Sequence, residues 1–186
     1  MLDPFPIPPP PWLVSSIKPF ADALNLHSLP LHAHEVLFAA ALYTFTAKIV
    51  SPYISTLFFP KLYPKLSRRG KINWDVHIVS FAQALIINGI SLWIIWFDEE
   101  RKGWRRVNAG VVGEGGEMRV WGYYGFGGLC QSFALGYFLW DLVTCSMNVE
   151  IFGVGMLAHA ISAVAVFGLG YVHHHLPSHR ILSLLC

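Results

Sequence analysis

The chain has 186 residues, of which 54% are hydrophobic and 13% charged, with a net charge of +2 and a mean hydropathy of +0.49. Soluble proteins carry about 25% charged residues, so this composition indicates a multi-pass membrane protein. The small net charge, with no basic stripe carrying interleaved aromatic residues, argues against nucleic acid as a partner. We therefore expect membrane lipids, and possible contacts with other membrane proteins, as the partners of this chain.

Residues 1–34 form an N-terminal segment outside the predicted membrane domain. Its first eleven residues are rich in proline and should be extended. Residues 12–30 contain one short helical candidate, for which two interpretations are open. It lies in the membrane interface, or it packs as an ordinary leader segment.

The first predicted membrane span covers residues 36–59 and contains two unusual residues. Lys48 lies near the middle of the span, where a lysine costs about 3 kcal/mol, so it should face protein or reach the interface. Pro52 should kink the helix. Residues 60–75 then carry five basic residues before a single acid, Asp75, which is typical of a cytosolic loop.

The second predicted span covers residues 76–97. At about 100° per residue, several small and polar residues fall on one face of this helix. They are His77, Ser80, Ala84, Asn88 and Ser91, with Gln83 at the edge. Such a stripe on an apolar helix should face the interior of the bundle, where partners satisfy it. Residues 98–120 form a glycine-rich connection.

The third and fourth predicted spans cover residues 121–146 and 151–172. The third has a face of small residues (Gly125, Gly128, Ser132 and Gly136) and no charge before Asp141. Only four residues separate the two spans, so we expect antiparallel neighbours. We also expect the small face of the third span to pack against the fourth.

Counting at about 1.5 Å per residue places most polar residues of the spans in one half of the bilayer or near its centre. That half lies toward loop 60–75 and the turn at 147–150. We interpret this as a polar cavity bounded by the second, third and fourth spans. Its candidate residues are His77, Gln83, Asn88, Asp141, His159 and Lys48.

Each candidate also has a plainer interpretation. Asp141 is close enough to its helix end to reach headgroup water, and Lys48 can extend to the interface. His159 is compatible with an ordinary packing role, and Gln83 and Asn88 with hydrogen bonds between helices. Three consecutive histidines, 173–175, cannot share one helix face, and no zinc, phosphate-loop or nucleophile motif is present. We expect no metal ion and no cofactor.

Four stretches of the sequence resemble the TLC domain. They are NWDVHIVSFAQALI, FDEERK, GYFLWDL and FGVGMLAHAISAVAVF. This domain is shared by translocating-chain-associated membrane proteins, ceramide synthases and uncharacterised lipid-related membrane proteins. The resemblance covers about residues 35–172 and is nearest to an uncharacterised fungal-type group. It implies a bundle of six or more helices, in the endoplasmic reticulum or related membranes, around a lipid-sized cavity.

The resemblance also bears on individual residues. Asp141 matches an aspartate of the family, and His159 matches the second of two adjacent histidines found in many members, including ceramide synthases. Ala158 stands in place of the first histidine, and Gln83 stands where many members have another. In ceramide synthases the pair acts with acids on a later helix. Four spans are fewer than the family pattern has, and the tail 173–186 reads unlike it, so we hypothesise a C-terminal truncation at Cys186.

The sequence therefore predicts an all-α, multi-pass membrane protein of the TLC type in the endoplasmic reticulum. Our first hypothesis is a non-enzymatic protein that binds or senses lipid, or regulates membrane lipid composition. The first alternative is an acyl-CoA-dependent N-acyltransferase, with His159 as general base and Asp141 orienting it. The second alternative is a helper of membrane-protein insertion or trafficking.

Overall fold

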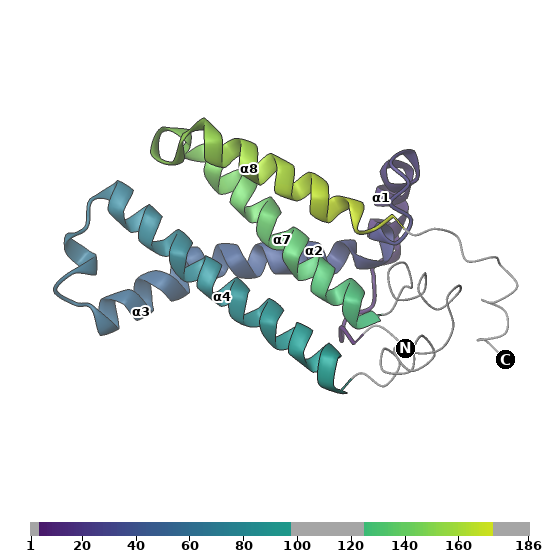
Figure 1. The fold of residues 1–186 in the computed structure, drawn as a ribbon, viewed down its shortest axis with the longest axis horizontal. Helices are drawn as coiled ribbons and strands as arrows, with labels where there is room; N and C mark the ends of the chain where they lie inside the picture. The colour runs from purple at the N-terminus through teal and green to yellow at the C-terminus, as the bar shows by residue number, and fades with distance from the viewer. Residues whose placement is uncertain (1–3, 98–124, 173–186) are drawn as a thin grey trace, which may run out of the picture.

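The computed structural model describes residues 4–97 and 125–172, and these residues form helices joined by short turns (Figure 1). The α-helices are α1 (Pro11–Ala23), α2 (Leu29–Phe45), α3 (Ser51–Phe58), α4 (Arg68–Phe97), α7 (Gly125–Met147) and α8 (Val149–Leu169). A π-helical turn, Thr46–Val50, joins α2 to α3, and a 3-10 turn, Tyr63–Lys65, precedes α4. No β-strand occurs among the described residues.

Three helical stretches are long and apolar enough to cross a membrane: Leu29–Phe58, Arg68–Phe97 and Val149–Leu169. Together they confirm the predicted all-α, multi-pass membrane class. The remaining predicted span corresponds to α7, whose 23 residues extend about 35 Å at 1.5 Å per residue. It is less apolar because it carries Gln131 and Asp141. Since α7 packs against α2, α4 and α8, less of its surface is left to face lipid.

Two helices begin earlier in the chain than the hydrophobic pattern predicts. The first span begins at Leu29 instead of residue 36, and α4 begins at Arg68 instead of residue 76. The charged residues 68–75 are therefore helical and not part of a loop. No proline interrupts this stretch, and hydropathy marks only where the membrane begins, not where the helix begins.

Pro52 does not break the first span, and the bend predicted at this proline coincides with a π-helical turn. Proline lacks an N–H group, and its ring clashes with the carbonyl group four residues earlier in a regular α-helix. The wider π turn over Thr46–Val50 lies directly before it, and the Ser51 N–H donates to the Thr46 carbonyl. This turn lets the chain continue as one helical stretch from Leu29 to Phe58.

The core consists of two clusters, and α7 contributes to both. One cluster joins α1, α2, α7 and the end of α8 through Ala21, Leu26, Val36, Leu135 and Tyr171. The other joins α2, α4 and α7 through Ala39, Tyr43, Ala47, Val79 and Trp140. Helix α7 is thus the central element of the described bundle, with α2 crossing behind it in Figure 1.

Helices α7 and α8 are joined through Asn148 alone and pack as antiparallel neighbours, as predicted (Figure 1). The ring centroids of Phe138 and Phe167 lie 4.6 Å apart, and the Gln131 amide donates to the Phe167 carbonyl. Gly153, at a φ of 81°, interrupts the first turns of α8, and glycine adopts this left-handed conformation without steric cost.

The prediction that the small face of α7 packs against α8 is wrong, because this face contacts α2. A Cβ atom at Gly136 would lie 2.6 Å from the Ala39 Cβ and 2.7 Å from the Val36 carbonyl oxygen. A Cβ atom at Gly128 would overlap the His32 imidazole. The absence of side chains at these two positions lets the backbones of α2 and α7 approach closely.

We predict that Gly136→Ala destabilises the protein. The added methyl group meets a backbone oxygen that cannot rotate away, and overpacking of this kind costs about 1–3 kcal/mol. The measurement is the thermal melting temperature of the full chain in detergent. The matched control is Gly89→Ala in α4, where a Cβ atom meets nothing within 4 Å. An equal melting temperature for both variants would show that the α2–α7 approach is less tight than described.

Candidate functional site

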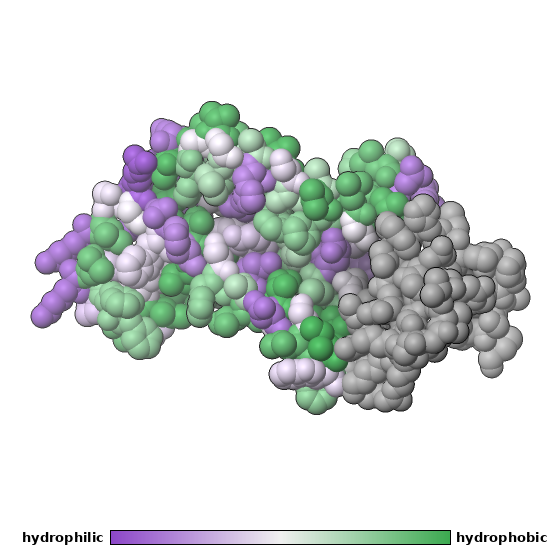
Figure 2. Space-filling model, viewed as in Figure 1, coloured by the Kyte–Doolittle hydropathy of each residue, from purple (hydrophilic) through white to green (hydrophobic). Residues whose placement is uncertain are grey.

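A cavity of about 690 Å³ lies between the first span, α4 and α7. It is at the end of the bundle that bears the α3–α4 connection and the α7–α8 turn, where hydrophilic residues gather on the left in Figure 2. Its lining combines charged, neutral polar and apolar side chains. The lining residues are Thr44, Ala47, Lys48, Pro52, Leu66, Arg68, Lys71, Ile72, Asp75, Val76, Trp140, Val143, Thr144, Met147 and Asn148.

Three cations and one carboxylate line this cavity. Lys48 comes from the π turn, and Arg68 and Lys71 come from the first turn of α4. The Lys71 ammonium lies 5.8 Å from the centre of the Tyr63 ring, within the range of a cation–π contact. The start of α4 adds the positive end of a helix dipole to the same region.

The carboxylate, Asp75, is already engaged by hydrogen bonds from the first span and the turn that follows it. The Ser51 hydroxyl donates to Asp75 Oδ1 at 2.6 Å. The Tyr63 hydroxyl lies 2.9 Å from Oδ1 and 3.1 Å from Oδ2. The neighbouring residue, Trp74, makes a second contact of this kind, because its indole N–H donates to the Ser55 hydroxyl at 2.9 Å. Asp75 therefore fixes α3 and the connecting turn onto α4.

The rest of the cavity wall is largely apolar. Ala47 and Trp140 are buried, Val76 is half-buried, and Val143 is exposed. Thr44 and Asn148 are polar, but each donates to the backbone of a neighbouring helix turn, at 2.8 Å to the Ala40 carbonyl and 2.9 Å to the Thr144 carbonyl. The charged groups left to meet a ligand are therefore cationic, and most of the remaining wall is apolar.

Of the six predicted cavity residues, only Lys48 lines this cavity. Gln83 is half-buried and accepts a hydrogen bond from the Tyr43 hydroxyl at 2.6 Å, which links α4 to α2. His77 and Asn88 are exposed and bond to carbonyl groups of their own helix, at 2.7 Å to Asn73 and 2.7 Å to Ala84. The prediction that these residues of α4 face the interior of the bundle is thus correct for Gln83 and wrong for His77 and Asn88.

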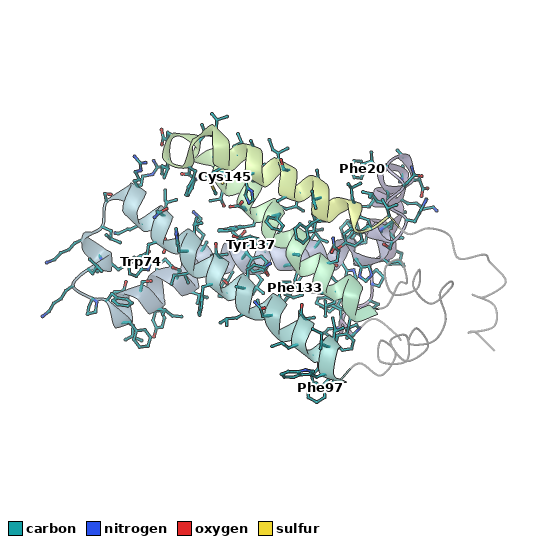
Figure 3. The ribbon with its side chains drawn as sticks, viewed as in Figure 1. Phe20, Trp74, Phe97, Phe133, Tyr137 and Cys145 are labelled. Carbon is teal, nitrogen blue, oxygen red and sulfur yellow. The ribbon has the colours of Figure 1, made fainter. Side chains whose placement is uncertain are left out.

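The face of α4 that meets α7 is defined by Ser80 and Ser91. Ser80 shares a hydrogen bond of 2.8 Å with the Tyr137 hydroxyl, and Ser91 lies 3.9 Å from the Cys130 sulfur. Figure 3 shows Tyr137 at the crossing of α7 and α4. Tyr137 also packs edge-on against Tyr43, with ring centroids 5.5 Å apart. This seam holds α2, α4 and α7 together and leaves His77 and Asn88 outside it.

Asp141 and His159 lie on the other side of α7, toward α8. Asp141 is 7% exposed and accepts a hydrogen bond from the Cys145 thiol at 3.6 Å. Figure 3 shows Cys145 on this side of α7. His159 is exposed on α8 and close enough to Asp141 to interact with it electrostatically. Neither residue lines the 690 Å³ cavity, which the first span, α4 and α7 bound without α8.

The sequence reasoning missed a buried ionisable pair in α2. His32 Nδ1 and Glu35 Oε2 lie 2.9 Å apart, and both side chains are completely buried. The pair sits next to Tyr171, whose hydroxyl is 2.9 Å from the Ser132 hydroxyl. The signal was available, because two ionisable residues three apart on an apolar helix are rare within a membrane. It was overlooked because His32 lies before the predicted start of the first span.

A second cavity, of about 520 Å³, lies between α1, α2, α7 and α8 and is lined only by apolar residues and glycine. It offers no polar group to orient a ligand. Among the described residues, no group of three or more His, Cys, Asp or Glu side chains is placed to hold a metal ion. The histidines 173–175 and the connection 98–120 lie outside the described residues.

The fold and the cavity define this chain as part of a multi-pass helical membrane protein with a polar pocket between its helices. The TLC domain matches residues 73–186, and the chain belongs to this family. It is 32% identical over 155 residues to an uncharacterized TLC domain-containing protein of Schizosaccharomyces pombe, covering 83% of this chain and 48% of that protein.

Two further relatives are more distant. One is the Topoisomerase I damage affected protein 4 of Saccharomyces cerevisiae, 26% identical over 73% of this chain and 43% of that protein. The other is the TLC domain-containing protein 4-B of Danio rerio, 29% identical over 73% of this chain and 47% of that protein. The chain thus spans about half the length of the curated relatives it matches. No solved structure matches it.

We predict that Tyr63→Phe weakens the attachment of the α3–α4 connection. Burial, together with the hydrogen bond and the negative charge of Asp75, raises the pKa of Tyr63 to about 12. The protonated hydroxyl is therefore favoured by folding. Its stabilisation is complete below pH 10, the ordinary pKa, and is lost as the pH rises toward 12. At neutral pH, loss of this bond to a carboxylate should cost about 1.5–3 kcal/mol.

The measurements are the melting temperature in detergent and the absorbance of tyrosinate during an alkaline titration. The variant should melt earlier and lack the tyrosine that ionises near pH 12. Tyr53→Phe is the control for stability, since Tyr53 is 71% exposed on α3. A wild-type titration curve that Tyr63→Phe leaves unchanged near pH 12 would contradict the described contact.

Proposed function

We propose that this chain binds membrane lipid without catalysing a reaction on it, and so senses or regulates the lipid composition of the endoplasmic reticulum membrane. The observation that carries the proposal is the cavity between the first span, α4 and α7, in which cationic and apolar side chains line one space. A lipid has the same division, with a polar headgroup attached to apolar chains.

The size and position of the cavity support this proposal. Its volume of about 690 Å³ falls within the range of about 300–1,000 Å³ typical of small-molecule sites. It lies between helices that cross the membrane, near the end where the charged residues of α4 begin. A lipid headgroup has direct access to such a position, while its chains remain beside Val76, Trp140 and Val143.

The placement of His159 supports a binding function over acyl transfer. A general base must lie within hydrogen-bond reach of the proton it removes. His159 and Asp141 face each other across α7 and α8 and do not line the cavity. A lipid bound beside Lys48 would therefore not be presented to His159.

We predict that Val143→Trp reduces the amount of lipid that co-purifies with the full chain. The larger side chain fills part of the cavity, and a steric cost of about 1.4 kcal/mol lowers affinity about tenfold. The measurement is mass spectrometry of lipids extracted from protein purified in detergent. Val166→Trp in α8 is the matched control, because Val166 is similarly exposed and does not line the cavity.

Two outcomes would contradict the proposal. Equal lipid content in the two tryptophan variants would show that lipid does not occupy this cavity. Formation of an amide from labelled acyl-CoA and a sphingoid base, abolished by His159→Ala, would establish acyl transfer instead. Bound lipid without such turnover is the expected result.

A further inference from the structure

We propose that the cavity selects the phosphate-bearing headgroup of an anionic phospholipid, with Lys48, Arg68 and Lys71 as its contacts. This inference rests on the proposed lipid-binding function and adds the chemical class of the ligand. It follows from the balance of positive and negative side chains that line the cavity.

Among the described residues, the cavity wall carries three cations and one carboxylate, so the single charge of Asp75 leaves an excess of positive charge. Both oxygens of Asp75 accept hydrogen bonds from the Ser51 and Tyr63 hydroxyl groups. The side chain is thereby held toward the first span and the 3-10 turn. An excess of positive charge remains on the wall, and it favours a ligand with net negative charge, most strongly where water is partly excluded.

Of the three cations, Lys48 is the one for which an anionic partner would offset the largest cost of placing a charge within the membrane. It lies ten residues before the end of α3, roughly 15 Å along the helix from that end. Among the described residues it forms no ion pair. A lysine at this depth is costly unless its ammonium group meets water or an anion. The cavity brings an anion from the membrane surface to it.

Arg68 and Lys71 face the same cavity from the first turn of α4. Arg68 also forms an ion pair with Glu150 at 3.3 Å, in which both side chains are 73% exposed. A surface pair of this kind contributes little, and guanidinium has further N–H groups for phosphate oxygens. The Tyr63 ring contacts the Lys71 ammonium, and the positive end of the α4 helix dipole favours an anion beside it.

The neutral polar side chains of the cavity are a weaker basis for recognition than its cations, because they carry no charge. The Thr44 hydroxyl and the Asn148 amide are each engaged by a backbone carbonyl group. A headgroup that offers only hydroxyl groups would therefore find few partners. Phosphate, by contrast, accepts several charge-assisted hydrogen bonds from lysine and arginine. The apolar wall at Val76 and Trp140 favours a lipid over soluble phosphate as its source.

The test compares two double variants that remove the same charge from the same end of the molecule. Lys48→Gln with Lys71→Gln removes two cavity cations. Lys61→Gln with Lys65→Gln removes two exposed lysines of the α3–α4 connection that do not line the cavity. Each full-length protein is equilibrated in detergent with equal amounts of phosphatidylglycerol and phosphatidylcholine, and the retained lipids are quantified by mass spectrometry.

The wild type and the Lys61/Lys65 variant should retain mainly phosphatidylglycerol. In the Lys48/Lys71 variant the ratio of phosphatidylglycerol to phosphatidylcholine should fall about tenfold. Lys48→Arg with Lys71→Arg should preserve the preference, which separates loss of charge from loss of folding. Inorganic phosphate should not displace the retained lipid.

Several results would overturn the inference. Retention of lipid by the wild type without a preference for phosphatidylglycerol would overturn the headgroup selection and leave the lipid-binding proposal intact. An equal loss of preference in both glutamine variants would show that general surface charge is responsible. Displacement by inorganic phosphate would show that the site takes soluble phosphate. Absence of any retained lipid would overturn the proposed function itself.

Discussion

The described bundle depends on the close approach of α2 and α7. Gly136 meets the Val36 carbonyl and Ala39 directly, and Gly128 leaves room for His32. Because these contacts leave no space for a side chain, they fix both the separation and the relative rotation of the two helices. That rotation brings Trp140 against Ala47 in one core cluster and Leu135 against Val36 in the other. The remaining helices, α4 and α8, then pack on either side of α7.

The cavity is a consequence of this arrangement combined with one hydrogen-bonded anchor. Asp75 holds the start of α4 against the first span through Ser51 and Tyr63. Lys48 and Lys71 consequently face one space from two different helices. Repulsion between these cations opposes the arrangement, and the anchoring hydrogen bonds, together with the apolar contacts of Trp140, stabilise it. A bound anion would relieve that repulsion, so ligand binding and stability are coupled at this end of the protein.

Membership of the TLC family is compatible with a departure from the histidine-based chemistry of ceramide synthases. Ala158 occupies the position where the resemblance places the first histidine of the pair. Gln83, where many members have a histidine, serves as a hydrogen-bond acceptor for Tyr43 and joins α4 to α2. The buried His32–Glu35 pair adds an ionisable group at the opposite end of α2 from Lys48, next to Tyr171.

The amino-acid sequence by itself determined the class of protein and the existence of the long helices. Hydropathy and residue count give only the depth of a residue in the membrane, and by depth six candidates were placed together, of which Lys48 alone lines the cavity. Only the tertiary structure decided which helices bound the cavity and which face of each helix is inside. The partner of Gly136 is α2 and not α8, and His77 points away from the seam that Ser80 forms. Arg68, Lys71 and Asp75 were assigned to a loop because hydropathy falls at the membrane surface while the helix continues beyond it. The rotation of a helix about its axis follows from side-chain contacts with its neighbours, and such contacts between distant segments are not encoded in the periodicity of any single helix.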